Sequence, residues 1–98
     1  MLTPKQRSYL RSLANDLQPL FQVGKQGIND NLIKQTNDAL EARELIKLSA
    51  LTTAPMSAKE ACEALAAATN AEAVFAIGNR FVLYRQSGEQ KNRKIFLD

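Results

Sequence analysis

Apolar residues recur at helical spacing in three separate stretches of the chain, and each stretch begins with residues that can cap a helix. The capping residues are Thr3 and Pro4 for the first helix, Asn29 or Asp30 for the second, and the pair Ser57 and Glu60 for the third. The expected buried stripes are Leu10, Leu13, Ala14 and Leu17, then Leu32, Ile33, Thr36, Ala39 and Leu40, and finally Ala58, Ala61, Cys62, Leu65 and Ala66. The pattern predicts three amphipathic helices that each bury one face.

Alternation of apolar and polar residues predicts four strands in the remaining segments, at 20–23, 44–51, 73–77 and 80–85. Gly78 and the residue after it separate the last two strands as a hairpin turn. The side chains expected to share a sheet face are Ile46, Leu48 and Ala50 in the second strand, with Lys47 and Ser49 opposite, and Ala73, Phe75 and Ile77 in the third.

The resulting order is α-β-α-β-α-β-β, which predicts a single-domain α/β fold over residues 1–98. We expect a two-layer sandwich, in which the second and third helices cover one face of a four-stranded mixed sheet and the first helix is an N-terminal addition. Residues 86–94 are polar and are expected to be mobile, while the apolar end at 95–97 is expected to dock back on the sheet.

Composition and charge narrow the classes of function. Thirteen Lys and Arg against ten Asp and Glu give a net charge of +3, which fits a polyanionic partner but does not establish one. With no histidine and a single cysteine, Cys62, the chain lacks the groups for a disulfide, a clustered zinc site or a Cys–His or Ser–His–Asp catalytic set. A short chain also disfavours a deep active site, so we expect no enzyme activity, cofactor, metal or small-molecule substrate.

The apolar segments bear on location and on the one thiol. No apolar run approaches the ~20 residues of a membrane span, and the N-terminus lacks the apolar core of a signal peptide. We therefore expect no membrane association and a cytoplasmic location. Cys62 lies on the apolar stripe of the third helix, where a core role is favoured over a reactive thiol.

Residues 23–28, with the sequence VGKQGI, form the segment with the clearest chemistry. Gly24 and Gly27 enclose Lys25 and Gln26 between a predicted strand and a helix start. Glycine permits positive φ and the close approach of a ligand, and the first N–H groups of the following helix favour anions. The lysine and the glutamine would add a charge and a hydrogen-bonding amide. The loop suits a phosphate backbone, although an isolated Gly-x-x-Gly spacing is also common in ordinary turns.

Basic residues gather in three segments of the sequence. The segments contain Lys5, Arg7 and Arg11, then Lys25 and Lys34, and then Arg80, Arg85, Lys91, Arg93 and Lys94. These segments could converge on one surface or remain separate solvated faces, and residue order alone leaves both alternatives open. Arg7 and Arg11 are one helical turn apart and are expected on an exposed face of the first helix.

Several motifs, in their order along the chain, resemble the CRM domain, also called the YhbY-like RNA-binding domain, of small bacterial ribosome-associated proteins and plant organellar splicing factors. The motifs are residues 2–7 with Leu10 and Arg11, Pro19 with 23–27, 39–40 with 44–47, and 77–79 with 82–85. The resemblance implies a fold similar to the C-terminal domain of bacterial translation initiation factor three. It also implies an RNA-binding surface that includes the glycine loop and, for stand-alone bacterial members, a link to precursors of the large ribosomal subunit.

The residues and the resemblance together predict a non-enzymatic protein that binds ribosomal RNA and assists assembly of the large ribosomal subunit, with pre-ribosomal particles as its partner. The predicted RNA-binding residues are Gly24, Lys25, Gln26, Gly27, Lys5, Arg7, Arg11, Lys47, Arg80, Tyr84 and Arg85. Tyr84 could stack on a base or be a strand tyrosine with one solvated end, and Lys47 could be a solvated strand position. Because the expected contacts are mainly to phosphates, the affinity for RNA should fall steeply as the salt concentration rises. The protein should also recognise RNA shape more than RNA sequence.

Two other classes of function stay open at this point. A protein-interaction adaptor without direct RNA contact would dock Phe21, Phe81 or Phe96 on a ribosomal protein or an assembly factor. An enzyme acting on RNA would need acid–base groups, for which Asp30 and Asp38 are the candidates. Their position on a polar helix face favours solvation over catalysis.

Overall fold

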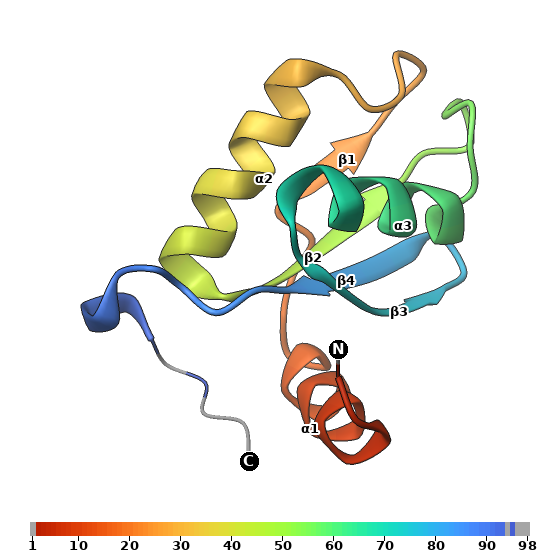
Figure 1. Ribbon diagram of the computed structural model, residues 1–98. Helices are drawn as coiled ribbons and strands as arrows, with labels where there is room; N and C mark the ends of the chain where they lie inside the picture. The colour runs from red at the N-terminus through yellow and green to blue at the C-terminus, as the bar shows by residue number, and fades with distance from the viewer. Residues whose placement is uncertain (1, 94, 96–98) are drawn as a thin grey trace.

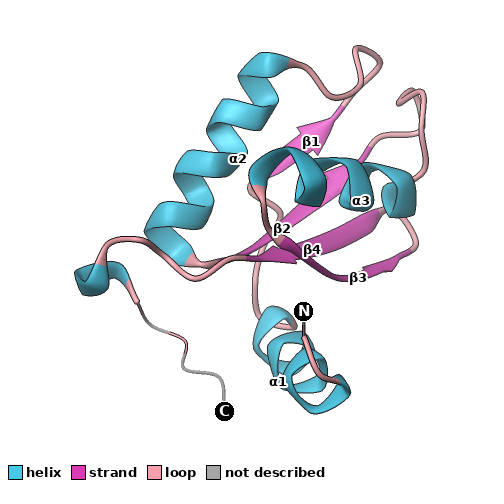
Figure 2. Cartoon of the chain, viewed as in Figure 1, coloured by secondary structure: helices cyan, strands magenta, loops and turns pink. Residues whose placement is uncertain are grey.

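The structure is a computed structural model and describes residues 2–93 and residue 95. Its elements are α1 (Pro4–Ala14), β1 (Phe21–Val23), α2 (Asp30–Arg43), β2 (Leu45–Ala50), α3 (Ala58–Thr69), β3 (Glu72–Ile77), β4 (Arg80–Tyr84) and a short 3-10 helix, η1 (Gln90–Asn92) (Figure 1, Figure 2). The predicted α/β class and the order α-β-α-β-α-β-β are confirmed, and η1 is an addition after the last strand.

The four strands form one mixed sheet, as predicted, and the structure gives their order as β1-β2-β4-β3, so β1 and β3 are the edge strands. β1 pairs in parallel with β2, whereas β4 runs antiparallel to both β2 and β3. Val23 pairs with Ala50, and Ser49 pairs with Arg80. The C-terminal ends of β1 and β2 therefore lie at the same end of the sheet as the hairpin turn between β3 and β4.

Each helix begins where the sequence indicates. Capping boxes join Thr3 to Gln6 at the start of α1 and Ser57 to Glu60 at the start of α3. Asn29, rather than Asp30, caps α2, because its Oδ1 accepts a hydrogen bond from the N–H of Leu32 at 2.8 Å. Such a cap satisfies a donor that would otherwise have no partner in the helix, and it fixes where the glycine loop ends.

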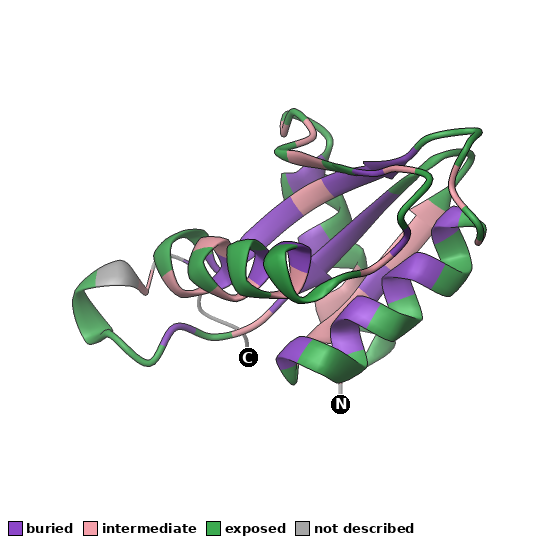
Figure 3. Cartoon of the chain, turned by 90° about the horizontal axis from the view of Figure 1, so that it is seen from above, coloured by how far each residue is buried: buried purple, intermediate pink, exposed green. Residues whose placement is uncertain are grey.

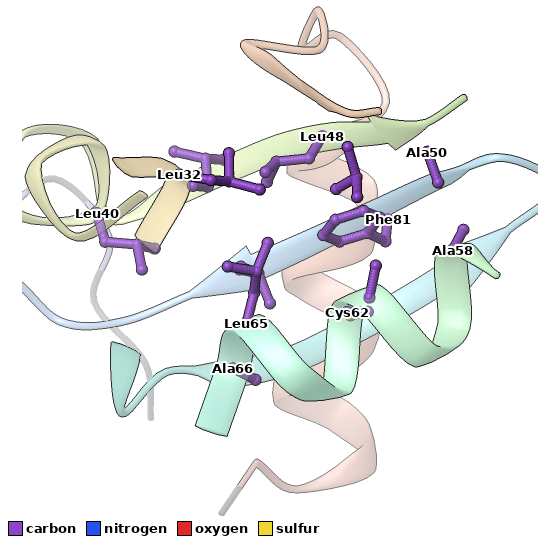
Figure 4. Packing of buried hydrophobic residues seen from close by; sticks show 13 residues of the cluster. Leu32, Leu40, Leu48, Ala50, Ala58, Cys62, Leu65, Ala66 and Phe81 are labelled. Carbon is purple, nitrogen blue, oxygen red and sulfur yellow. The ribbon is translucent and has the colours of Figure 1, made fainter. Parts of the chain in front are cut away.

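The main hydrophobic core lies between the sheet and helices α2 and α3. The labelled side chains of Figure 4 that meet there include Leu48 and Phe81 from the strands, Leu32 and Leu40 from α2, and Cys62 and Leu65 from α3. Buried residues are concentrated in the strands, and the outer sides of the helices are exposed (Figure 3). The core confirms that α2 and α3 cover one face of the sheet, with each fully buried large side chain contributing roughly 1.5–3 kcal/mol before entropy is counted.

Helix α1 packs against the opposite face of the sheet (Figure 1). Its Leu10 and Ala14 are buried in a second cluster with Leu45, Val74, Val82, Tyr84 and Ile95. Leu13 was expected in the buried stripe but is 37% exposed, because it lies on the flank of α1 away from Leu10 and Ala14. The two predicted layers are thus accompanied by a short helix that covers part of the second sheet face and leaves Ile77 exposed.

β3 contains an irregularity that the sequence pattern does not indicate. The register against β4 shifts between Ala73 and Phe75, so Val74 is an extra residue in a β-bulge. Ala73 packs on the main core, whereas Val74 and Phe75 both pack on the α1 side. The expectation that Ala73, Phe75 and Ile77 share one face is wrong, because the bulge interrupts the alternation.

Two carboxylates hold the segment that follows β4. Glu44 is fully buried, and its side chain accepts hydrogen bonds from the N–H groups of Ser87 at 2.8 Å and Ile95 at 3.0 Å. Glu41 accepts from the N–H of Gly88 at 3.0 Å. These bonds attach the C-terminal segment to the C-terminal end of α2.

The mobility predicted for residues 86–94 stays a prediction, to which the structure adds specific contacts. Besides the bonds to the two glutamates, Arg93 Nε donates to the carbonyl of Ser87 at 2.8 Å. Ile95 is buried in the α1-side cluster, which confirms docking for that residue. Residues 94 and 96–98 lie outside the described part of the chain.

Candidate nucleic-acid interface

Residues 24–27 form a tight turn between β1 and α2. The N–H of Gly27 donates to the carbonyl of Gly24 at 2.9 Å, which places Lys25 and Gln26 at the two central positions of the turn. Both side chains are exposed. The turn therefore presents a cation and a carboxamide to the solvent, directly before the N-terminus of α2, where helix N–H groups favour anions.

The two glycines of the turn have different structural roles. Gly27 has a φ of +69°, and a Cβ at this position would lie 3.1 Å from Pro55 Cγ and 3.4 Å from Met56 Cε. The φ of Gly24 lies outside the left-handed region, and a Cβ there would meet Leu51 Cδ1 at an ordinary 3.9 Å. The fold therefore requires glycine at position 27, whereas a close ligand would give position 24 its own reason for glycine.

The turn lies at the end of the sheet where β1 and β2 finish and the hairpin joins β3 to β4 (Figure 1). The N–H of Ala50 donates to the carbonyl of Asn79 in the hairpin turn at 2.7 Å. Arg80 begins β4 immediately after this hairpin turn and is exposed. Lys25 and Arg80 thus lie at the same end of the sheet, although they are far apart in the sequence.

A groove of about 290 Å³ lies between the turn, the edge strand β1 and the first half of α2. Its walls include Gln22 from β1, Lys25 and Gln26 from the turn, and Asn31, Leu32 and Gln35 from α2. Five of the lining residues carry carboxamides and none carries a carboxylate. The groove therefore places neutral hydrogen-bonding groups beside the cation of the turn.

Five groove residues are absent from the RNA-binding set that the sequence predicts, and three of them, Gln22, Asn31 and Gln35, are exposed carboxamides with no capping role. Asn31 and Gln35 are four residues apart, so helical spacing alone places them on one face of α2. Gln22 lies on β1, where only Val23 separates it from the turn. Only the packing of α2 beside β1 reveals that the three side chains share one groove, since periodicity does not say which strand a helix face meets.

The arginine at the start of α1 has a structural role. Arg7 is half-buried, and its Nη1 donates to the carbonyls of Ala73 and Val74 at 2.5 and 2.6 Å. The expectation of an exposed face is therefore wrong for Arg7, because the bulge in the edge strand β3 offers carbonyls to this guanidinium. Arg11 is exposed and lies over the ring of Phe75, with 5.0 Å between its Cζ and the ring centroid.

Arg85 is also held within the fold. Its Nη1 donates to Asn37 Oδ1 at 2.7 Å and to the carbonyl of Thr69 at 2.6 Å. Its Nη2 lies 3.7 Å from Glu41 Oε1. The guanidinium links α2 to α3 at the end of the sheet opposite the turn, which leaves it poorly placed to join an interface with Lys25.

Tyr84 is buried on the α1 side of the sheet, with 7% of its surface exposed. Its burial, together with the nearby Glu44 carboxylate, raises the pKa of its hydroxyl above the ordinary value. The ring is therefore not available to stack on a base in this structure, and the interpretation of Tyr84 as a packed strand residue is favoured.

The remaining predicted basic residues lie on the α1 side. Lys5 is exposed on α1, and Lys47 is half-buried on the β2 face that points away from the main core, as predicted. The basic residues do not all converge. Lys25 and Arg80 lie at one end of the sheet, but the pairing of Arg80 with Ser49 places Arg80 on the sheet face of Lys47, toward α1. Lys5, Arg11 and Lys47 also lie on the α1 side, and Arg7 and Arg85 bond within the fold.

The residues considered for the other classes of function are poorly placed for them. Phe81 is fully buried and Phe21 is half-buried against the main core, while Phe96 lies outside the described residues. Asp30 and Asp38 are exposed on α2. Within residues 2–93 and 95, no group of three or more His, Cys, Asp or Glu side chains could hold a metal ion.

The thiol of Cys62 is buried in the core. Cys62 is 3% exposed, and burial, with a smaller effect of Glu63, raises its pKa from 9.0 to about 11. This favours the core role over a reactive thiol. Among the helices of the described chain, none is both long and apolar enough to cross a membrane.

Comparison with known proteins identifies close similarities over almost the whole chain. The sequence profile of the CRS1/YhbY (CRM) domain matches residues 2–85. The chain is 52% identical over 91 residues to "Probable RNA-binding protein YqeI" of Bacillus subtilis, with 93% of this chain and 95% of that protein covered. It is 32% identical over 90 residues to an "RNA-binding protein" of Haemophilus influenzae, with 92% and 91% covered.

The fold is also similar to a solved structure. The solution structure of a hypothetical Staphylococcus aureus protein, described as a candidate RNA-binding protein, superposes with a TM-score of 0.78. The two sequences are 50% identical, and the match covers 97% of this chain and 99% of the other. Sequence and fold thus agree on one family.

Proposed function

The chain belongs to the CRS1/YhbY (CRM) domain family, and from this premise we propose that it binds RNA through the turn at residues 24–27 and the groove beside it. The relatives that match nearly the whole chain carry the name RNA-binding protein, which supports RNA as the partner. The geometry of the turn supports the site, because an exposed lysine and an exposed carboxamide precede a helix N-terminus.

The observation that carries the proposal is the difference between the two glycines. Gly27 is explained by its positive φ and by its contact with Pro55. Gly24 has neither constraint within the protein, and it borders the same groove as Lys25. A phosphate group that lies against the backbone at position 24, with its charge near the lysine, would account for a glycine that the fold does not need.

We further propose that the RNA is precursor ribosomal RNA of the large subunit and that the protein assists assembly of pre-ribosomal particles in the cytoplasm without catalysing a reaction. A small basic domain can hold a folding RNA segment through phosphate contacts and release it as ribosomal proteins bind. Lys25, Gln26 and Arg80 would supply the central contacts. Lys5, Arg11 and Lys47 would extend the footprint on the α1 side.

The test is retention of large-subunit precursor RNA on filters across a series of salt concentrations. Replacing Lys25 and Gln26 by alanine should weaken binding about tenfold. It should also make the plot of log affinity against log salt less steep, by the amount expected for the loss of about one phosphate contact. Gly24→Ala should weaken binding without changing stability, because its Cβ would fit the fold but meet the RNA.

The matched control for charge is Lys91→Ala, because this exposed lysine lies in η1 at the far end of α2 from the turn. It removes one positive charge and should leave affinity nearly unchanged. Equal binding by the wild type, the turn variants and the control would refute the turn as the site. Binding to precursor RNA that is no tighter than to unrelated RNA would refute the ribosomal part of the proposal alone.

A further inference from the structure

The groove beside the turn has a composition that phosphate binding does not require. Cations and N–H donors, including the NH₂ groups of carboxamides, contact phosphates, but the acceptor oxygens of carboxamides do not. The groove carries one lysine and five carboxamides, so most of its side chains offer an acceptor that a phosphate cannot use. Asn29 uses its Oδ1 to cap α2. Across the described part of the chain, the structure gives no protein hydrogen-bond partner to the side chains of Gln22, Asn31 and Gln35, which are exposed.

Carboxamides match the edges of nucleobases. Each has an acceptor oxygen and an NH₂ donor on one plane, so it can pair with a donor and an acceptor that lie side by side on a base. A carboxamide is neutral, and it therefore adds recognition without adding attraction to every phosphate.

The size and position of the groove fit a single nucleotide. Its 290 Å³ is at the lower limit of the roughly 300–1,000 Å³ of small-molecule pockets, which is room for one base rather than for a duplex. Gly24 and Lys25 line the same groove, so a phosphate at the turn and its base in the groove belong to one nucleotide or to neighbours. The base must be unpaired to enter the groove, because the pairing edge of a base in a duplex is occupied by its partner and side chains cannot read the narrow major groove of an A-form helix.

We propose that this groove seats an unpaired base of single-stranded RNA and reads its edge through Gln22 and Gln35, so that the protein has a base preference in addition to its phosphate contacts. The inference rests on the proposed function, since the turn must hold the RNA backbone for the groove to receive a base. It also departs from the expectation that shape alone is read, because the carboxamides distinguish one base from another.

The experiment measures binding of the full chain to oligo(A), oligo(C) and oligo(U) of equal length and to a fully paired RNA duplex. The wild type should prefer one of the single strands about fivefold or more over the others and should bind the duplex more weakly. Replacing both Gln22 and Gln35 by alanine should bring the ratios close to one while the salt dependence stays the same, because no charge is removed.

Two further variants keep the test independent of folding defects. Gln22→Met with Gln35→Met preserves side-chain size but removes the hydrogen-bonding groups, and it should lose the preference as the alanine variant does. Gln90→Ala changes an exposed glutamine of η1 and should keep the wild-type ratios. Circular dichroism checks that each variant is folded.

The outcomes separate this inference from the function on which it rests. If the wild type binds every single strand equally and with a steep salt dependence, the base-reading groove is refuted while RNA binding stands. If both double variants keep the wild-type ratios of affinity for the single strands, the base-reading groove is refuted as well. If the wild type binds none of the RNAs at low salt, the proposed function and the inference fail together.

Discussion

Glu44 combines a buried carboxylate with a left-handed backbone conformation. It is fully buried, it has a φ of +67° at the C-terminal end of α2, and its carboxylate accepts from the N–H groups of Ser87 and Ile95. A buried carboxylate is costly unless donors surround it, and a non-glycine residue rarely adopts positive φ. We infer that the bonds from Ser87 and Ile95 offset the cost of burying Glu44, and that the same bonds attach the C-terminal segment to α2.

Glu44→Gln should therefore lower the free energy of unfolding by about 1–3 kcal/mol, because the new NH₂ group would face backbone N–H donors. Urea denaturation measures the change, and hydrogen exchange should show faster exchange at Ser87 and Ile95 in the variant. Glu63→Gln, an exposed position on α3, is the control. A loss of stability no greater than in the control would contradict the role assigned to Glu44.

Alanine substitutions at the two glycines of the turn should differ in their effect on stability. Gly27→Ala should destabilise the fold by about 1–2 kcal/mol, because alanine is disfavoured at a φ of +69° and its Cβ would press on Pro55. Gly24→Ala should stay within about 0.5 kcal/mol of the wild type. Thermal denaturation of the two variants compares them directly, and a reversed order of stability would show that the turn has another geometry.

At the scale of elements, the edge strand β3 depends on a residue from α1. Edge strands present unpaired backbone groups to other chains, and proteins protect them with bulges and charges. β3 has both protections, since Val74 forms a bulge and Arg7 binds the carbonyls of Ala73 and Val74. Helix α1 thus protects the edge strand β3 as well as covering part of the sheet face.

Arg7→Ala should cost about 1–2 kcal/mol of stability and increase self-association at high concentration, because the carbonyls of the bulge lose their donor. Lys5→Ala removes the same charge from an exposed position of α1 and serves as the control. Light scattering and urea denaturation would reveal both effects. The structural role is contradicted if Arg7→Ala reduces RNA affinity but leaves stability and association like those of Lys5→Ala.

Helix α3 contributes a pH dependence through Cys62. Burial raises the pKa of this thiol to about 11 in the folded protein, from 9.0. Because the unfolded thiol loses its proton at lower pH, the stability that Cys62 provides is complete below about pH 9 and is lost as the pH rises toward 11. Tyr84 shifts in the same direction, so both groups act in alkaline solution.

Cys62→Ala should thus be less stable than the wild type at neutral pH, by about 1 kcal/mol for the lost packing. From pH 9 to pH 11 the wild type should lose up to about 2 kcal/mol relative to the variant, since only the wild type carries the thiol, so the order of stability should reverse near pH 11. Urea denaturation at several pH values provides the comparison. A difference that stays constant across this range would mean that the thiol is not held protonated by the fold.

For the whole molecule, the sequence predicts what local rules determine. Caps such as Asn29 and Ser57 bond to residues three positions away, and the helix stripes follow from spacing alone, so the elements and their order are predictable. The sequence wrongly predicts an exposed Arg7, because the carbonyls that accept its hydrogen bonds lie 66 and 67 residues further along the chain. Periodicity identifies a polar position but does not show whether the fold supplies a partner for it.

The candidate site divides in the same way. The turn at 24–27 is visible in the sequence because glycine and its neighbours define it locally. The burial of Tyr84 depends on where α1 docks, and the groove depends on α2 lying beside β1, so neither follows from spacing. The structure therefore argues against Tyr84 and Arg85, at the C-terminal end of β4, as RNA contacts and adds the groove to the proposed interface.

The proposed interface places RNA at the turn and groove rather than on the α1 side or along the whole basic surface. The most direct measurement is an NMR titration of the isotope-labelled chain with single-stranded RNA. We expect the backbone signals of the turn, Gly24, Lys25 and Gln26, and the side-chain amides of Gln22 and Gln35 to shift most. The signals of Arg7 and Arg85 should change little. Shifts concentrated on α1 and at the Tyr84 end of β4, with the turn unaffected, would contradict it.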